Sequence, residues 1–311
     1  MTEILFSQLT KRGYKGRIVP VERIHDLKEE IESPYSKGSL DEEFYKERLD
    51  FFEFDPPDSL PKGRSMVIIA VPRPQVRVIF NWKGERLPLI IPPTYVAYKN
   101  TYRQVGNLLT EILGGGKYGV AKASLPEKLL AAHSGLGFYG KNNICYVNGM
   151  GSFHQLVSFY TELPCRKHDW QELRPMKRCE NCSACLRRCP TGAIISERFL
   201  FRAERCIVFH NEREGDFPSW IDANWHNCVI GCLECQRVCP ENKNLLDWVE
   251  GKEEFSQEET AFLLQGKSFD RLPPSMLEKL ERLSLVGWFD VLSRNLDALF
   301  TSKAALLYPP V

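Results

Sequence analysis

The chain has 311 residues, enough for one large domain and one or two smaller ones. Hydrophobic residues make up 43% of it and its formal net charge is +1, which argues against a non-specific nucleic-acid binder with its clear basic excess. No stretch reaches the roughly 18 apolar residues of a membrane span. The N-terminus has no signal-peptide pattern, so we expect a cytoplasmic protein without a membrane partner.

The first part of the chain predicts an α/β domain. Residues 1–64 are polar with helical spacing, and the continuous apolar run at residues 65–71 is typical of a buried strand. Shorter strands are predicted at residues 76–80 and 87–92, and the prolines of the second indicate a sheet edge.

Helices and a glycine-rich loop complete this domain. A helix at residues 97–113 should stop at Gly114-Gly115-Gly116. A second helix, at residues 125–134, tolerates Pro126 in its first turn and leads into the loop at residues 135–143. This loop is either a helix C-cap with a turn, or a set of backbone N–H groups that face a large anionic or amide-bearing ligand. Strands at 144–147 and 151–160 follow, and the domain closes near residue 170.

Nine of the eleven cysteines lie between Cys179 and Cys239. The first run, which begins at Cys179, is the C-x2-C-x2-C-x3-C-P signature of bacterial-type ferredoxins, in which the fourth cysteine ligates the other cluster. The second run, which begins at Cys232, repeats the last three cysteines and the proline. Zinc sites close on four ligands and disulfides require an exported chain, so the two runs predict two [4Fe-4S] clusters.

The second run lacks one ligand, because Val229 stands where its first cysteine should be. Cys206 and Cys228 could supply it, and Cys206 is favoured because cluster ligands usually come from distinct loops. Cys228 is then a spare or a small buried hydrophobe. The predicted ligands are Cys179, Cys182, Cys185 and Cys239 for one cluster, and Cys189, Cys206, Cys232 and Cys235 for the other.

The chain after the second run reads as helical, with helices expected at residues 258–264 and 275–300. The fold class is therefore α+β. The predicted domains are an α/β domain (1–170), a dicluster ferredoxin-like domain (171–245) and a short helical C-terminal segment (246–311).

Several stretches together resemble the cobalamin-dependent epoxyqueuosine reductases, distant relatives of the reductive dehalogenases. They lie at residues 60–72, 134–143, 151–153 and 160–163 and in both cysteine runs, and the resemblance covers roughly residues 50–245. It implies that the α/β domain binds a base-off corrinoid and that the clusters pass electrons to cobalt. It also supports Cys206 over Cys228. The implied corrinoid-binding residues are Gly140, Lys141, Asn142, Ser152 and Phe153.

Two departures from the family change the expected substrate. The family's proton-donating aspartate, counted back without gaps from Gly137, falls at Ala121. Tyr139, Lys122 and Tyr102 become the candidate proton donors, because dehalogenating relatives use a tyrosine near a cation. The stretch after Cys239 is also too short for the helical-repeat domain with which longer members grip tRNA, so tRNA is not expected as a partner.

We therefore predict a corrinoid-dependent iron–sulfur reductase that acts on a small molecule other than epoxyqueuosine in tRNA. Its electrons should come from a low-potential donor of the ferredoxin or flavodoxin type. One alternative is an iron–sulfur electron carrier, or an activator that reduces a partner corrinoid protein and has no organic substrate. The other is a truncated epoxyqueuosine reductase that acts on tRNA.

Overall fold

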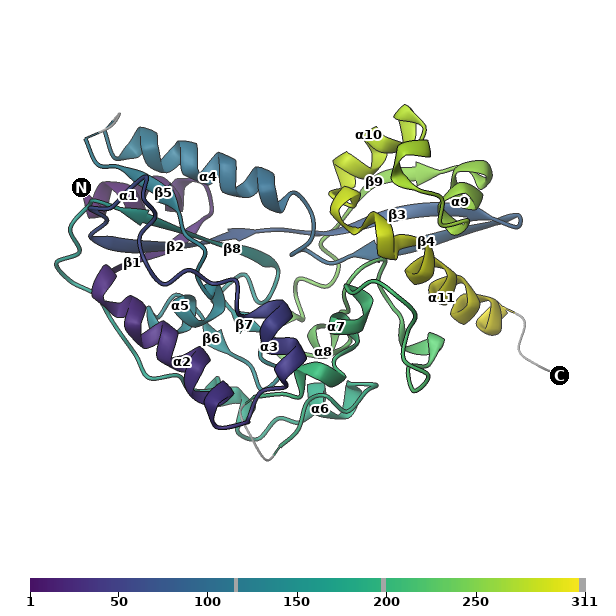
Figure 1. Ribbon diagram of the computed structural model, residues 1–311, viewed down its shortest axis with the longest axis horizontal. Coiled ribbons are helices and arrows are strands. Elements are labelled where there is room, and N and C mark those ends of the chain that lie inside the picture. Colours follow the sequence, from purple (N-terminus) through teal and green to yellow (C-terminus); the bar gives the residue numbers. More distant parts are fainter. Residues whose placement is uncertain (115–116, 197–199, 308–311) are drawn as a thin grey trace. The chain divides into compact units, whose positions relative to one another are not determined.

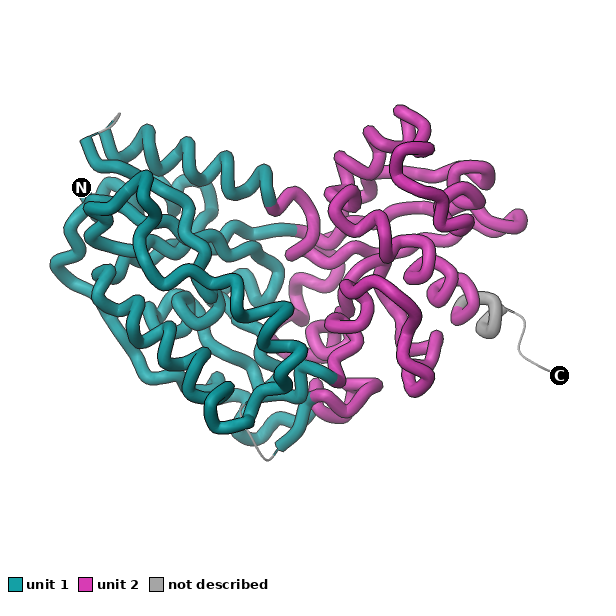
Figure 2. The backbone as a smooth tube through the Cα atoms, in the orientation of Figure 1, with its two compact units in different colours: residues 1–73, 99–183, 194–204 teal, residues 74–98, 184–193, 205–311 magenta. Residues whose placement is uncertain are grey.

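The computed structural model describes residues 1–114, 117–196 and 200–307 (Figure 1). The chain divides into two compact units (Figure 2). Unit 1 comprises residues 1–73, 99–183 and 194–204, and unit 2 comprises residues 74–98, 184–193 and 205–311. This division differs from the boundaries predicted at residues 170 and 245. The two short strands predicted at residues 76–80 and 87–92 belong to unit 2, with the C-terminal part of the chain.

Unit 1 is built on a four-stranded antiparallel sheet in the order β1-β2-β8-β5. A short β6–β7 ladder lies outside this sheet. The predicted strand at residues 65–71 is confirmed as β2, and the predicted strand at residues 151–160 begins three residues later as β8. The elements are α1 (Thr2–Lys11), β1 (Lys15–Pro20), a 3-10 turn (Val21–Arg23), α2 (Ile24–Ser36), α3 (Glu42–Arg48), β2 (Ser65–Pro72), α4 (Tyr98–Ile112), β5 (Val120–Lys122), α5 (Glu127–His133), β6 (Phe138–Tyr139), β7 (Cys145–Tyr146), β8 (His154–Thr161) and a 3-10 turn (Lys177–Cys179).

The sheet of unit 1 is covered on both faces (Figure 1). Alternate residues of a strand point to opposite faces, so Val67 and Ile69 pack with α1 and α4, while Met66 and Ile68 pack with α2 and α5. Every residue of β8 is buried. The core of this unit therefore lies in two apolar layers on either side of β2 and β8.

Unit 2 contains a three-stranded sheet in the order β4-β3-β9, packed against α9, α10 and α11. The proline-containing strand β4 lies at the sheet edge, as predicted. The elements are β3 (Gln75–Trp82), β4 (Glu85–Ile91), α6 (Ala184–Arg188), a 3-10 turn (Ala203–Arg205), α7 (Ile207–Asn211), a 3-10 turn (Ala223–Trp225), α8 (Glu234–Arg237), a 3-10 turn (Pro240–Asn242), β9 (Val249–Phe255), α9 (Gln257–Leu264), a 3-10 turn (Phe269–Arg271), α10 (Pro274–Leu283), a 3-10 turn (Val286–Trp288) and α11 (Phe289–Leu307).

Three local predictions were wrong. The stretch predicted as entirely helical before residue 64 contains β1, which pairs with β2. The C-terminal segment contains β9, which pairs in parallel with β3. The helix predicted at residues 275–300 is two helices, because Ser284 adopts a left-handed conformation (φ +59°) and ends α10. The predicted stop after α4 is described at Gly114 (φ +88°), whereas Gly115 and Gly116 lie outside the described residues. No helix in the described ranges is both long and apolar enough to cross a membrane.

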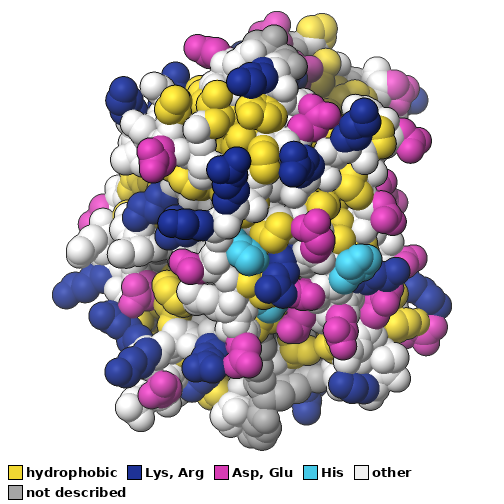
Figure 3. Space-filling model, turned by 90° about the vertical axis from the view of Figure 1, so that its left-hand side faces the viewer, with side chains coloured by type: hydrophobic (Ala, Val, Ile, Leu, Met, Phe, Trp, Pro, Cys, Tyr) yellow, Lys and Arg dark blue, Asp and Glu magenta, His cyan; other side chains and the backbone are white. Residues whose placement is uncertain are grey.

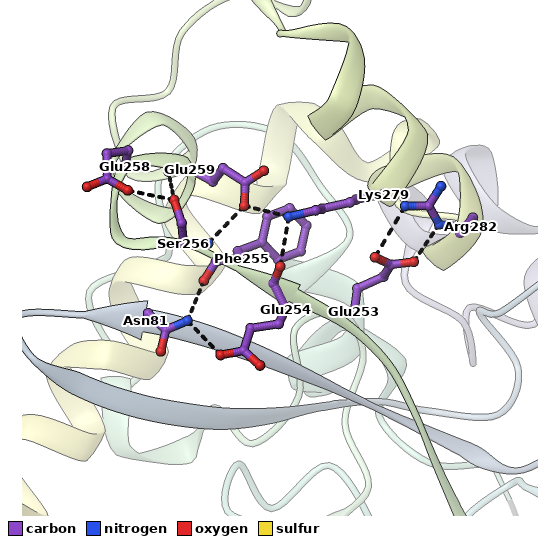
Figure 4. Close-up of polar contacts among 9 residues, drawn as sticks. All are labelled: Asn81, Glu253, Glu254, Phe255, Ser256, Glu258, Glu259, Lys279 and Arg282. Carbon is purple, nitrogen blue, oxygen red and sulfur yellow. Dashed lines mark hydrogen bonds and ion pairs between the residues drawn. The ribbon is translucent and has the colours of Figure 1, made fainter.

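Charged side chains connect β9 to the helices that cover it (Figure 4). Lys279 Nζ donates to Glu254 O at 2.8 Å and to Glu259 Oε2 at 2.6 Å. Asn81 Nδ2 donates to Glu254 Oε1 at 2.9 Å, and Arg282 forms an ion pair with Glu253. These contacts come from α10, α9 and β3, so they fix a strand whose own sequence is mostly charged.

Ser256 caps α9 in a reciprocal box with Glu259 (Figure 4). We expect Ser256→Ala to lower the free energy of unfolding by about 1 kcal/mol, because one helix donor loses its acceptor. Denaturant unfolding followed by circular dichroism measures this. Ser268→Ala is the matched control, since Ser268 precedes a 3-10 turn without a side-chain cap. An equal loss in both variants would contradict the assignment.

Candidate functional site

A short helix begins at the same place in each of the two cysteine runs. In the first run α6 begins between the second and third cysteines, and in the second run α8 begins at the equivalent place. The two short helices pack together, and Arg188 of α6 forms an ion pair with Glu234 of α8. All eleven cysteines are free of disulfide bonds. Among the described residues, no three His, Cys, Asp or Glu side chains converge as ligands of a single metal ion.

Cys206 lies near two other predicted ligands of its cluster. Burial, together with the charges of Cys232 and Cys189, raises the pKa of Cys206 to about 12. Arg205 Nε donates to Thr191 O at 3.3 Å, and Thr191 Oγ1 lies 3.5 Å from Cys189 Sγ. The loop that carries Cys206 is therefore held beside the end of the first run, as the assignment of this thiol requires.

Cys228 also lies beside Cys232, but next to the apolar core. It is fully buried, its Sγ donates to Asn227 Oδ1 at 3.2 Å, and burial raises its pKa well above the ordinary value. The next two residues, Val229 and Ile230, belong to the apolar core of unit 2. This setting is that of the small buried hydrophobe considered for Cys228, and the ligand assignment itself stays a prediction.

Helix α11 is hydrogen-bonded to the segment that precedes Cys232, a predicted cluster ligand. Asn295 of α11 is fully buried and donates to Asn211 O at 3.0 Å and to Val229 O at 3.3 Å. Asn211 Oδ1 accepts from Gly231 N at 2.6 Å, one residue before Cys232. The carboxamides of Asn295 and Asn211 thus connect α11 to the end of α7 and to the segment just before Cys232.

A second polar cluster lies in unit 1 where β5 ends. Tyr102 of α4 donates its hydroxyl proton to Glu127 Oε1 and accepts from Ser158 N at 3.2 Å. Ser158 Oγ donates to the same carboxylate oxygen at 3.3 Å, and Lys122 Nζ lies 4.5 Å from the centre of the Tyr102 ring. The structure therefore brings together two of the predicted proton donors, Tyr102 and Lys122, around a carboxylate.

Glu127 was not predicted as a site residue. In the sequence it is one of several charged residues at the start of a helix, with no motif around it. Its partners come from α4 and β8, which are distant in the sequence. Local residue spacing therefore could not show that these side chains meet. Ala121, where the gapless count places the family's aspartate, lies in β5 opposite Tyr160 and packs against the core under α2 and α5.

Tyr139, the third predicted donor, lies in β6. Burial raises the pKa of Tyr139 well above its ordinary value, and Cys145 and Glu30 add to the shift. Its backbone pairs with β7, and its carbonyl accepts from Met176 N at 2.8 Å. Tyr139 is therefore a weak acid in a structural setting.

The glycine-rich loop uses much of its hydrogen-bonding capacity internally. Gly135 (φ +68°) follows Ser134, the C-cap of α5, and Gly140 N donates to Ile144 O at 2.8 Å. A Cβ at Gly140 would lie 2.5 Å from Asn142 Oδ1 and 2.7 Å from a Tyr146 ring atom. These contacts favour the C-cap and turn interpretation for this part of the loop.

The predicted corrinoid-binding side chains are also engaged within the protein. Lys141 Nζ donates to Cys182 O at 3.0 Å, in the first cysteine run, and Asn142 Nδ2 donates to Tyr146 OH at 3.0 Å. Ser152 and Phe153 are buried immediately before β8. The role of these residues in binding a corrinoid stays a prediction.

The face of unit 1 shown in Figure 3 carries acidic and basic side chains side by side. Such mixing does not produce the continuous basic surface by which many proteins hold a nucleic-acid backbone. Any binding of a polyanion to this face would have to use a few individual basic side chains.

Comparison with known proteins identifies the cysteine region and the fold. A family described as a 4Fe-4S double cluster binding domain matches residues 178–242. An epoxyqueuosine reductase of Francisella cf. novicida is 31% identical over 147 residues, which is 46% of this chain and 40% of that protein. That of Staphylococcus aureus is 25% identical over 229 residues, which is 71% of this chain and 58% of that protein. The chain spans 29 to 58% of the length of four such curated relatives.

Solved structures of similar fold have related names. The epoxyqueuosine reductase of Streptococcus thermophilus has a TM-score of 0.66 at 17% identity, covering 98% of this chain and 83% of that one. An epoxyqueuosine reductase solved with an epoxyqueuosine-modified tRNA stem loop has a TM-score of 0.66 at 22% identity, covering 97% and 80%. The Bacillus subtilis protein, solved with its aspartate-bearing catalytic loop swung out of the active site, has a TM-score of 0.57 at 23% identity, covering 91% and 84%.

Proposed function

We propose that this chain, a homologue of the epoxyqueuosine reductases with a 4Fe-4S double cluster domain, is a corrinoid-dependent reductase that takes its proton from Glu127. It is an epoxyqueuosine reductase-like iron–sulfur protein whose match covers only part of the length of such relatives. The observation that carries the proposal is the Tyr102–Glu127–Ser158 cluster at the end of β5. It provides an ionisable group next to the strand in which the family's aspartate is replaced by Ala121.

Cobalamin is the cofactor expected of this family, and the buried polar atoms of unit 1 are compatible with it. His154 Nδ1 and Tyr160 OH are buried without a hydrogen-bond partner, on the same face of β8. Burial lowers the pKa of His154 to about 4, so its ring is neutral near pH 7. The two groups would hold the amide side chains of a corrinoid rim, and the bound corrinoid would supply a strongly reducing cobalt centre.

Glu127 lies where the carboxylate left after proton transfer would be stabilised. Tyr102 and Ser158 both donate to its carboxylate oxygen, and such bonds stabilise the anion that remains after the proton has left. Glu127 is half-buried, so it can regain a proton from water. Lys122 adds a positive charge beside the Tyr102 ring, which favours the same anionic state.

Epoxyqueuosine in tRNA is the first substrate to test. Removal of an epoxide oxygen consumes two electrons and two protons and releases water, which matches one-electron clusters used twice together with a proton donor. The curated relatives have this activity in their names, and one similar fold was solved with the modified stem loop. These names count against the sequence-based expectation that tRNA is not a partner.

A second substrate class is favoured by Ala121. A reductase that has exchanged its aspartate for a glutamate placed elsewhere would direct the proton to a different atom of the substrate. A small molecule with a reducible carbon–oxygen or carbon–halogen bond would suit this arrangement. The sequence itself predicted only a substrate other than epoxyqueuosine in tRNA, such as a small molecule.

Anaerobic reconstitution with iron, sulfide and cobalamin tests the proposal. We expect about eight iron atoms per chain, because each cluster contains four, together with retained cobalamin. Incubation with a reductant and an epoxyqueuosine-bearing stem loop, followed by mass spectrometry of the nucleosides, then separates the two substrate classes. Samples without cobalamin are the control.

The outcomes have different meanings. Conversion of the stem loop identifies tRNA as the substrate, whereas retained cobalamin without conversion supports the second class. Full iron content without retained cobalamin would reject the reductase and leave the electron carrier. Zinc in place of iron would reject the cluster assignment itself.

A further inference from the structure

The carboxamide of Asn227 contacts the sulfur of a predicted cluster ligand. Its Nδ2 donates to Cys232 Sγ at 3.1 Å and to Trp225 O at 3.1 Å. Its Oδ1 accepts from Leu233 N at 2.9 Å and from Cys228 Sγ at 3.2 Å. All four hydrogen-bonding positions of this amide are therefore occupied within one loop.

The orientation of the amide follows from its main-chain partners. Leu233 N can only donate and Trp225 O can only accept, so the oxygen must face the first and the nitrogen the second. The remaining N–H of Asn227 is therefore directed at Cys232. A flipped amide would place two acceptors against each other and two donors against each other.

We propose that Asn227 raises the reduction potential of the cluster held by Cys189, Cys206, Cys232 and Cys235, through its N–H···S hydrogen bond. On reduction this cluster gains one electron from a low-potential protein donor, and no bond is made or broken. The added negative charge spreads onto the ligand sulfurs, and a donor directed at a sulfur stabilises the reduced form more than the oxidised form. The potential becomes less negative as a result.

This effect belongs to one cluster only. Cys182 of the first run corresponds to Cys232 of the second. Counting back equally from both cysteines, the residue that corresponds to Asn227 is Lys177. Lys177 is exposed and has no carboxamide. Asn227 would therefore make the two clusters unequal, by raising the potential of the cluster of Cys232.

The backbone supplies a weaker contact at the same sulfur. Glu234 N lies 3.5 Å from Cys232 Sγ, compared with 3.1 Å for Asn227 Nδ2. Mutation removes the side-chain donor and leaves the backbone donor in place. The role of Asn227 can therefore be measured without loss of every hydrogen bond to Cys232.

EPR-monitored redox measurements on the reconstituted chain test the proposal, and they require neither substrate nor turnover. In Asn227→Ala and Asn227→Asp we expect the reduction equilibrium of one cluster to fall by a factor of about ten, which is about 59 mV for a one-electron couple. The shift should be larger for Asn227→Asp, which places a carboxylate beside the sulfur. The other cluster should keep its potential.

Asn224→Asp is the matched control, because Asn224 is an exposed asparagine of the same segment that bonds Asp222 and not a sulfur. It should leave both potentials unchanged. Unchanged potentials in both Asn227 variants, or equal shifts of both clusters, would overturn the proposal. Loss of four irons from both variants would also overturn it. Asn227 would then be required for cluster assembly and would not act on the reduction potential.

Discussion

Replacing Cys206 by alanine is expected to remove one of the two clusters and to lower the iron content from about eight to about four atoms per chain. Cys206 lies where the charges of Cys189 and Cys232 reach it, so its loss opens the cluster that these two ligands share. Burial raises the pKa of this thiol to about 12, so it is neutral at pH 7 in the empty protein. Cluster assembly must then displace its proton, and loading of this site should improve as the pH rises.

Cys228→Ala provides the matched comparison, because this thiol also lies beside Cys232 and is fully buried. We expect it to keep both clusters and to lose stability only by about 1 kcal/mol, the typical value of one hydrogen bond. Iron and sulfide analysis of the two reconstituted variants gives the answer directly. Full iron in Cys206→Ala together with half the iron in Cys228→Ala would reverse the ligand assignment.

The cysteine spacing allowed the cluster region to be predicted because the relevant signal is local. Three thiols two residues apart and a proline after the fourth define a binding loop without any knowledge of the rest of the chain. The buried strands β2 and β8 were predictable for a similar reason, since each is a long apolar run. Strand β9 was not, because four of its seven residues are charged and it is held by partners such as Lys279 and Asn81.

The end of α10 shows another limit of local signals. Ser284 adopts the left-handed conformation that usually marks a glycine, so nothing in the sequence predicted a helix end there. Glu127 was missed for a different reason, because its neighbours Tyr102 and Ser158 come from distant parts of the chain. Local patterns predicted the cluster ligands, whereas the candidate acid required the three-dimensional fold.

The contacts of the C-terminal part of unit 2 show what it does in the fold. The sequence predicted only a short helical segment there. Instead, Asn295 and Arg294 of α11 bond the carbonyls around Asn211, and Asn211 in turn holds Gly231 beside Cys232. Helix α11 therefore stabilises the loop that leads to Cys232, one of the predicted cluster ligands.

Glu127→Gln is expected to lower turnover by about 10²- to 10⁴-fold, the usual contribution of a positioned general acid. The amide keeps the size of the side chain and can still accept from Tyr102 and Ser158, but it has no proton to give. Tyr102→Phe removes one donor to the carboxylate and should cause a smaller loss, since Ser158 remains in place. Rates are measured anaerobically with excess reductant, on the substrate that the stem-loop assay or the small-molecule screen identifies.

The variants must be shown to keep their cofactors before the rates are interpreted. Iron content and cobalamin retention should match the unmodified chain, because Glu127 contacts Tyr102 and Ser158, which are not predicted cluster ligands. Glu111→Gln changes an exposed carboxylate on α4 and should leave the rate unchanged. Full turnover in Glu127→Gln would move the proton donor to Lys122 or Tyr139, whereas loss of cobalamin from this variant would make Glu127 part of the binding site and not the acid.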